Sequence, residues 1–457
     1  MTNNHKMRPP ITDYRLPCTD SLFHLPKGFG RTCLSLILTL ALLVACNQPE
    51  PPPTPTPAPA PANPDSAPAV VENPPTAPQP AEEPAPDLSG RIVLWHSWAE
   101  ADGDALAALL SAFQAEHPNL AVDTLFVGYN DLPQSYADAV LSGGGPDLIL
   151  AAGWWVDDMV AARIVQPLDE LVAPPALASF WPATLEHFRR DGQLYALPTH
   201  FELVSLFANR ALIGDAPAPS TTNDLLALAQ QNPQRGSGLY ASLYHLYWGL
   251  PAYGAQLFDA EGRVILDQQE GASQFLGWLI AMNQTPGVFV DSDYGMLLDR
   301  FKKGEFAFFV DGPWAIDDLR AALGENLSVL PLPAGPGGAG RPWLSADGVF
   351  LNPNSPPDQQ RRALALARFL TSPAAGQTLA QVARRLPANL SAGVGDDPLL
   401  QGFMQQAAAA ESMPGIPEMQ NVWGYGGDML IKALNRVGEP AEIVVETATL
   451  INEANGK

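Results

Sequence analysis

The sequence predicts an α/β fold that begins near residue 90 and contains a parallel sheet. The chain has 457 residues, of which 46 % are hydrophobic and 16 % are charged, a composition typical of globular proteins. At about 150 residues per domain, this length corresponds to two or three domains. Between residues 90 and 152, strand and helix patterns alternate at the spacing of parallel strands joined by crossovers.

Each predicted element has a local signal. Residues 91–95, RIVLW, are β-branched and apolar, as expected of a strand. Apolar residues at i, i+3, i+4 and i+7 from Leu106 indicate a helix that ends at Pro118. Further elements are predicted in this order: strand 120–127, helix 132–141, strand 147–151, helix 297–301, strand 306–310, a helix that starts in residues 311–314, and helices 359–370, 373–382 and 440–452.

The first 89 residues are predicted to lie outside the folded part. Residues 34–45, LSLILTLALLVA, form an apolar run that is too short to span a bilayer but has the length of a signal-peptide core. The run ends in LVAC, which resembles a bacterial lipobox. Residues 1–45 are therefore predicted to be a lipoprotein signal peptide and Cys46 the lipidated residue. The alternative is a plain signal peptide with an incidental cysteine.

Residues 46–89 are predicted to be a disordered tether. Residues 49–86 hold 16 prolines in 38 residues, mixed with Ala, Thr and Glu. Such a segment has little apolar surface to bury and favours extended polyproline II conformations. It would connect a lipid anchor to the folded part.

Composition excludes several classes of function. The net charge of −23 makes nucleic acid and anionic membrane surfaces poor partners. Three cysteines are too few for a disulfide scaffold or a Cys-based zinc site. No G-x-S-x-G, H-E-x-x-H or C-x-x-C motif is present, and the histidines lack metal-like spacing. We therefore predict no catalytic residues, no metal and no cofactor, although the abundant carboxylates leave a glycosidase pair open.

Four patterns, in order, carry a family resemblance. They are LSGGGPDLIL (141–150), GQLYALPTHFELVSLFANRALI (192–213), FKKGEFAFFVDGPWA (301–315) and MPGIPEMQNVW (413–423). Together they resemble the family 1 extracellular solute-binding proteins of ABC importers, of the maltose/maltodextrin-binding type. The resemblance covers essentially all of residues 90–457.

The resemblance implies a two-lobed periplasmic-binding-protein fold, type II-like, in which each lobe is a sheet flanked by helices and a hinge joins the lobes. By analogy, lobe one comprises residues 90–200 with 346–386. Lobe two comprises residues 201–345 with 387–457. Ligand would bind in the interlobe cleft, where strand ends and domain junctions both tend to place sites.

The resemblance also assigns ligand-binding residues. Glu202 matches the family's cleft glutamate, and Trp314 and Trp423 match its stacking tryptophans. The remaining candidates are Trp98, Trp154 and Trp155, which lie at the ends of predicted strands where the family's loops reach ligand, and Tyr244. Tyr244 lies where the family carries a cleft tyrosine, although the flanking sequence shows little identity there. Aromatic platforms and carboxylates suit sugars, because pyranose faces are apolar while their edges need hydrogen-bond partners. The alternative is that these aromatic residues belong to the lobe cores.

The sequence also departs from the maltose type. Ala99 and Glu100 replace an acidic-basic pair in the first loop, Trp154 and Trp155 replace a charged pair, and Gly427 stands near an expected arginine. The resemblance therefore implies the fold of the maltose-binding type but not its specificity for maltose.

We predict a lipid-anchored, non-enzymatic substrate-binding component of an ABC importer, held at the outer face of the cytoplasmic membrane. It would bind a sugar or oligosaccharide as a monomer and deliver it to permease transmembrane subunits, with a separate ATPase. Three alternatives stay open: a non-sugar solute (a polyol, glycerophosphodiester or peptide), a secreted glycoside-acting enzyme, and a surface adhesin or sensor. A phosphate-bearing ligand is disfavoured because basic residues are scarce near the candidate loops.

Overall fold

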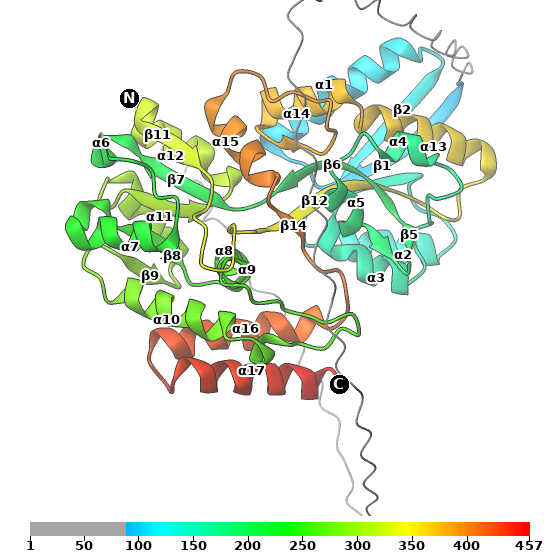
Figure 1. The fold of residues 1–457 in the computed structure, drawn as a ribbon. Coiled ribbons are helices and arrows are strands. Elements are labelled where there is room, and N and C mark those ends of the chain that lie inside the picture. The colour runs from blue at the N-terminus through cyan, green and yellow to red at the C-terminus, as the bar shows by residue number, and fades with distance from the viewer. Residues whose placement is uncertain (1–87, 215) are drawn as a thin grey trace, which may run out of the picture. The chain divides into compact units, whose positions relative to one another are not determined.

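The computed structural model describes residues 88–214 and 216–457 (Figure 1). The predicted signal peptide, Cys46 and the tether up to residue 87 lie outside these residues. Strands and helices alternate along much of the described chain, so the predicted α/β class is confirmed. In this part of the chain, no helix combines the length and the apolar character that a membrane span requires.

The first sheet contains the strands predicted from residue 90 onward. β1 (Gly90–His96) pairs in parallel with β2 (Leu120–Phe126) and β3 (Leu148–Ala152), as predicted. The sheet as a whole is mixed, because β12 (Trp343–Leu351) lies antiparallel to β3 and to β6 (Ala196–Glu202). Two short strands add to it, β13 on β6 and β14 on β12, in the order β13-β6-β12-β3-β1-β2. Their bounds are β13 (Leu386–Pro387) and β14 (Glu411–Ser412).

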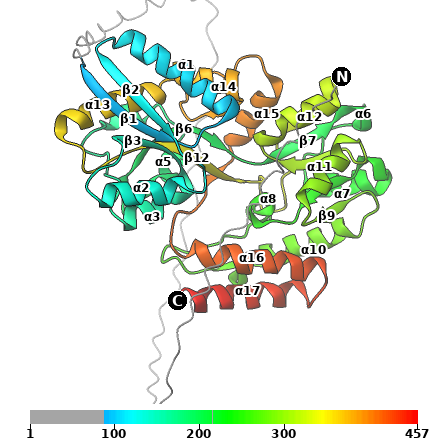
Figure 2. The same cartoon turned by 180° about the vertical axis from the view of Figure 1, so that it is seen from behind.

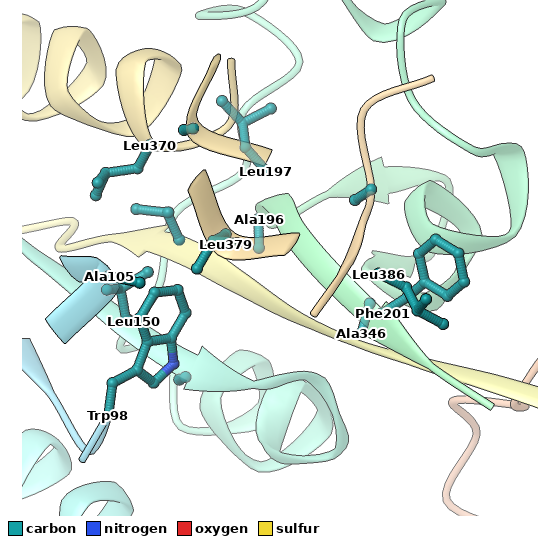
Figure 3. Close-up of a cluster of buried hydrophobic side chains, with 14 of the residues drawn as sticks. Trp98, Ala105, Leu150, Ala196, Leu197, Phe201, Ala346, Leu370, Leu379 and Leu386 are labelled. Carbon is teal, nitrogen blue, oxygen red and sulfur yellow. The ribbon is translucent and has the colours of Figure 1, made fainter. Parts of the chain in front are cut away.

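Helices cover both faces of this sheet. Figures 1 and 2 show α1 (Glu100–Glu116), α13 (Pro357–Leu370) and α14 (Pro373–Ala383) on one face. The other face carries α2 (Leu132–Leu141), α3 (Val156–Ala161) and α5 (Pro182–His187). β3 is buried along its whole length because both faces are covered. Figure 3 shows buried side chains of this region, with Trp98 beside Ala105 and Leu150.

The second sheet has five strands in the order β11-β7-β10-β8-β9. The strands are β7 (Ser205–Asn209), β8 (Ser237–Tyr240), β9 (Phe289–Asp291), β10 (Phe308–Asp311) and β11 (Leu327–Leu330). The helices around it are α6 (Arg210–Ile213), α7 (Thr222–Gln231), α8 (Leu243–Leu246), α9 (Gly249–Ala252), α10 (Gly271–Asn283), α11 (Tyr294–Lys302), α12 (Ile316–Leu323), α15 (Pro398–Ala407), α16 (Met419–Leu434) and α17 (Pro440–Ala454). Outside the two sheets lie α4 (Pro174–Leu177) and the hairpin of β4 (Arg189–Arg190) and β5 (Gln193–Leu194).

Side-chain alternation divides the core of the second sheet. Phe207 and Phe309 belong to a hydrophobic cluster that extends to the first sheet, whereas Phe308 and Val310 belong to a separate cluster with α10, α16 and α17. Successive side chains of a strand point to opposite faces, so each central strand supplies both clusters.

The chain passes between the sheets within short segments. β6 ends at Glu202 and β7 begins at Ser205, and the chain returns between β11 and β12. These segments place the carboxyl end of β6 directly before the amino end of β7. The elements that end here carry the candidate site.

Candidate functional site

Five polar side chains gather where β6 ends and β12 passes it, and we call them the polar cluster. They are Asp102, His200, Glu202, Asp347 and Arg385. Arg385 donates two hydrogen bonds to Asp102, Nε to Oδ1 at 2.8 Å and Nη2 to Oδ2 at 2.6 Å. His200 Nε2 lies 3.8 Å from Asp347 Oδ2. The cluster is thus a set of titratable groups of which only Asp102 and Arg385 form a close ion pair.

Strand register explains how these residues meet. Asp347 of β12 lies opposite His200 of β6, and Ser345 lies opposite Glu202. Ser345 Oγ donates a long hydrogen bond of 3.5 Å to Glu202 Oε1. A bulge between Asp347 and Gly348 interrupts the pairing at this level, and bulges commonly redirect side chains near functional sites.

Helix ends supply the other two members. Asp102 lies in the first turn of α1, where a carboxylate is favoured by the helix dipole. α14 is followed by Arg384 in the left-handed conformation, with φ 52°. This turn leads directly through Arg385 into β13, which pairs with β6.

Burial controls the charge of the polar cluster. Burial raises the pKa of Glu202 and of Asp347, although Arg385 opposes the shift at both. Burial also lowers the pKa of His200, which is therefore neutral at pH 7. At Asp102, burial would raise the pKa, but the hydrogen bonds from Arg385 outweigh it and the pKa is lowered. Glu202 and Asp347 are consequently acceptors whose charge is stabilised by few partners.

The second sheet presents an aromatic group where β8 and β10 end. Asp311, fully buried at the end of β10, accepts from the Tyr294 hydroxyl at 2.9 Å and lies 3.4 Å from His245 Nε2. The His245 ring contacts the Trp314 ring at 5.8 Å, and the Tyr244 and Trp314 ring centroids are 6.3 Å apart. Asp311 thus fixes the residues that support Trp314.

A short turn exposes the Trp314 ring. The 3₁₀ helix Pro313–Ala315 follows Gly312, as the DGPW pattern predicts, although its first turn is 3₁₀ rather than α-helical. A Cβ at Gly312 would lie 2.1 Å from the Trp314 ring, so only glycine allows this ring position. Trp314 remains 37 % exposed.

Three predicted site residues come together across the two sheets. Glu202 raises the pKa of Tyr244 through its charge, in addition to the larger effect of burial, so the two side chains are neighbours. Tyr244 in turn contacts Trp314. A carboxylate, a phenol and an exposed indole therefore line one region.

The other predicted residues lie around this region in different settings. Trp98 is buried, and its ring packs against His200 at 5.3 Å. Trp154 and Trp155 lie in the 3₁₀ helix Gly153–Trp155, after β3, and both contact Tyr129. Trp423 of α16 packs edge-on against the buried Trp343 at 5.4 Å.

Sequence reasoning missed four members of the polar cluster: Asp102, His200, Asp347 and Arg385. A usable signal existed only for Asp347, which interrupts the apolar run WLSADGVFL. We expected basic residues to be scarce near the site, and Arg385 is an exception. Its guanidinium is already hydrogen-bonded to Asp102. Among the described residues, no group of three or more potential ligands is arranged to hold a metal ion.

Comparison with known proteins identifies the family. The family model "Bacterial extracellular solute-binding protein" matches residues 97–377. This chain belongs to that family. It is 26 % identical over 352 residues to the maltotriose-binding protein of Pyrococcus abyssi, covering 74 % of this chain and 76 % of the relative. It is 24 % identical over 296 residues to a maltooligosaccharide ABC transporter solute-binding lipoprotein of Streptococcus pneumoniae, covering 58 % and 66 %.

The fold of this solute-binding protein is also found in solved structures. The Thermus thermophilus maltotriose binding protein, bound with maltotriose, matches with a TM-score of 0.63 and 26 % identity over 79 % of this chain and 99 % of that one. This likeness confirms the predicted two-lobed α/β fold of the maltose/maltodextrin-binding type. The first and second sheets are the centres of its two lobes.

Proposed function

We propose that this chain is the substrate-binding component of an ABC importer and binds a sugar or oligosaccharide between its two sheets. The observation that carries the proposal is the grouping of Glu202, Tyr244 and the exposed Trp314. An indole offers a flat apolar surface to a pyranose face, while a carboxylate and a phenol serve the hydroxyl edges.

Relatives support the ligand class. Two proteins that share about a quarter of their residues with this chain are named for maltotriose and for maltooligosaccharides. The sequence departs from the maltose type at Ala99, Glu100, Trp154 and Trp155, so the proposal extends to oligosaccharides in general. Binding would favour the closed arrangement of the lobes through its contacts with both.

We further propose that Cys46 carries lipid and that residues 46–89 tether the lobes to the outer face of the membrane. The LVAC sequence supports the anchor, and one relative is named a lipoprotein. The tether would keep the protein near permease transmembrane subunits at high effective concentration. Chemical conversion of the sugar forms no part of this role.

A thermal-shift screen with product analysis tests the function. The probes are maltotriose, maltotetraose, galactooligosaccharides, glycerol, glycerophosphocholine and short peptides. Bound ligand raises the unfolding temperature by mass action. We expect a shift with one sugar class, sugar recovered unchanged, and loss of the shift in Trp314→Ala but not in Val437→Ala, an exposed control. Sugar consumption would indicate an enzyme, and shifts confined to non-sugars would contradict the proposal.

A further inference from the structure

The polar cluster carries more negative than positive charge. Asp102, Glu202 and Asp347 are carboxylates, and Arg385 is the cation among the five members. His200 adds no charge at pH 7, because burial lowers its pKa. Three carboxylates therefore face one guanidinium group.

Arg385 is engaged by Asp102, which leaves the other two carboxylates unpaired. The guanidinium donates to both oxygens of Asp102, at 2.8 Å and 2.6 Å. Among the described residues, the hydrogen bond that Glu202 accepts is the long one of 3.5 Å from Ser345, and neither Glu202 nor Asp347 forms an ion pair with a lysine or arginine. The Asp347 side chain is 25 % exposed, so a ligand can reach it.

Strand register places Glu202 and Asp347 within reach of one ligand group. Asp347 lies opposite His200, which stands two residues before Glu202 on β6. Residues two apart on a strand point to the same face, so the two carboxylates are diagonal neighbours with Cα atoms about 7–8 Å apart. A single donor group that lies between them can bond to both.

The second sheet brings a further negative charge to the same region. Asp311 accepts a hydrogen bond from the Tyr294 hydroxyl at 2.9 Å and lies 3.4 Å from His245 Nε2. Within the described chain, no lysine or arginine forms an ion pair with Asp311. Burial raises the pKa of Tyr244, and the charges of Glu202 and Asp311 raise it further. Tyr244 therefore lies in the negative field of carboxylates from both sheets.

Other arginines that adjoin the site region are paired within the protein. Arg190 forms an ion pair with Asp157 of α3. Arg341, two positions before β12 begins, places Nη1 3.5 Å from Glu411 Oε2. These guanidinium groups are already matched by carboxylates, so they do not balance the polar cluster.

The hydrogen-bonding capacity of the polar cluster favours a ligand group that only donates. A carboxylate is an acceptor only, whereas a sugar hydroxyl both donates and accepts. A protonated amino group has three donors, no acceptor and a positive charge, so it matches both the surplus acceptors and the surplus negative charge. The exposed indole of Trp314 suits the ring that carries the amino group, because a pyranose face is apolar.

We propose that Glu202 and Asp347 bind a protonated amino group, so that the ligand is an amino sugar or an oligosaccharide that contains one. The inference rests on the proposed function and deepens it, because it names the class of sugar. It also assigns a ligand-binding role to Asp347, which the sequence patterns did not reveal. The ligand then supplies the cation that the protein does not provide at these two carboxylates.

Calorimetric titration of the purified full chain at pH 6, where the amino groups are protonated, tests this inference. The probes are the β-1,4-linked disaccharide and trisaccharide of glucosamine, each paired with cellobiose or cellotriose, in which a hydroxyl replaces every amino group. Maltotriose and spermidine, a polyamine without a sugar ring, complete the set. The variants are Asp347→Asn and Glu202→Gln. The control is Asp104→Asn, which removes an equal charge from the exposed side of α1.

We expect the glucosamine oligomers to bind at least tenfold more tightly than their hydroxyl counterparts and maltotriose. Asp347→Asn and Glu202→Gln should each reduce this preference about tenfold, and Asp104→Asn should retain it. The comparison of matched sugars in the unmodified protein needs no variant, so it decides the question even where a variant fails to fold.

Two results would count against the inference in different ways. An uncharged sugar that binds as tightly as the glucosamine oligomers, or a preference that is unchanged in both carboxylate variants, would overturn the amino-sugar inference and leave the proposed function intact. Binding of no sugar, whether or not spermidine binds, would overturn both.

Discussion

Glu202 combines the ligand-binding role proposed above with a cost to stability. Burial raises the pKa of its carboxyl group, so the group favours folding below its unfolded pKa of about 4.5, and that contribution is lost as the pH rises through the folded pKa. Glu202→Gln stays uncharged and should therefore be more stable than the parent at pH 7 but not at pH 4. The same substitution should weaken binding of the sugar that gives the largest thermal shift about tenfold, because hydrogen bonds to a charged acceptor are lost.

Urea unfolding at pH 4 and pH 7, together with calorimetric titration, checks the Glu202 prediction. A Gln variant that is less stable at pH 7 would show that the carboxylate is satisfied by the protein itself, in conflict with the account of the polar cluster.

His187 should make stability depend on acid pH. It is 1 % exposed, and burial, assisted by Arg190, lowers its pKa to about 4. A lowered pKa gives stability that is present above the unfolded value of 6.5 and is lost as the pH falls toward 4. Between pH 7 and pH 4.5 the loss should be roughly 2–3 kcal/mol. The comparison is the urea unfolding of wild type and His187→Asn at both pH values, and equal losses in the two proteins would refute the assignment.

Local sequence predicts some site residues and not others, for a physical reason. Trp314 follows β10, a strand that the sequence predicts, and Glu202 lies within a family pattern that is recognisable along the chain. Asp102 and Arg385 are 283 positions apart and meet because α1 packs against α14, the helix that leads into Arg385. No periodicity along the chain encodes that meeting.

The turn after β3 should tolerate only glycine at residue 153. A Cβ there would lie 2.3 Å from the His187 ring and 2.5 Å from the Ala346 carbonyl oxygen. Gly153→Ala should therefore destabilise the protein by about 1–3 kcal/mol. It should also weaken binding of the sugar that gives the largest thermal shift, because the turn carries Trp154, which the resemblance predicts to bind ligand.

A second glycine is the matched control for the Gly153 substitution. Gly277 lies inside α10, and a Cβ there would meet no atom within 4 Å. Gly277→Ala should stabilise by about 0.5–1 kcal/mol. Urea unfolding of both variants measures the change in the free energy of unfolding. A Gly153→Ala variant that is as stable as the parent would contradict the described packing.

At the scale of elements, the strands and the second helix of residues 90–152 are predicted to within one residue, because their apolar patterns are strong. The first helix, α1, begins at Glu100, before the first apolar residue of its predicted pattern, and ends at Glu116 rather than at Pro118. The mixed character of the sheet is not predictable in the same way. β12 comes later in the chain than both strands that flank it, β3 and β6. Its apolar pattern does not indicate which strands it pairs with, nor whether the pairing is parallel or antiparallel.

Over the whole molecule, one hydrophobic cluster joins both sheets. Phe403 of α15 packs on Phe207 of β7 at 5.5 Å, within a cluster that includes Ile92 and Leu150 of the first sheet. The two lobes should therefore unfold in one transition, with equal calorimetric and van't Hoff enthalpies. Phe403→Ala should cost about 3–5 kcal/mol and split the transition.

Differential scanning calorimetry checks this cooperativity, with Phe275→Ala as a control. Phe275 is equally buried but belongs to the separate cluster of the second sheet, so its removal should lower stability without splitting the transition. Two transitions in the unmodified chain would show that the lobes fold independently.

Hydrogen exchange followed by mass spectrometry, with and without the sugar that gives the largest thermal shift, shows whether the sugar lies between the two lobes. We expect protection in two sets of segments, residues 196–205 and 343–347 near the polar cluster and residues 308–316 around Trp314. We also expect the sugar to be recovered unchanged. Protection confined to one sheet or to the far ends of the lobes, or conversion of the sugar, would contradict the claim that an unmodified sugar binds between the two lobes.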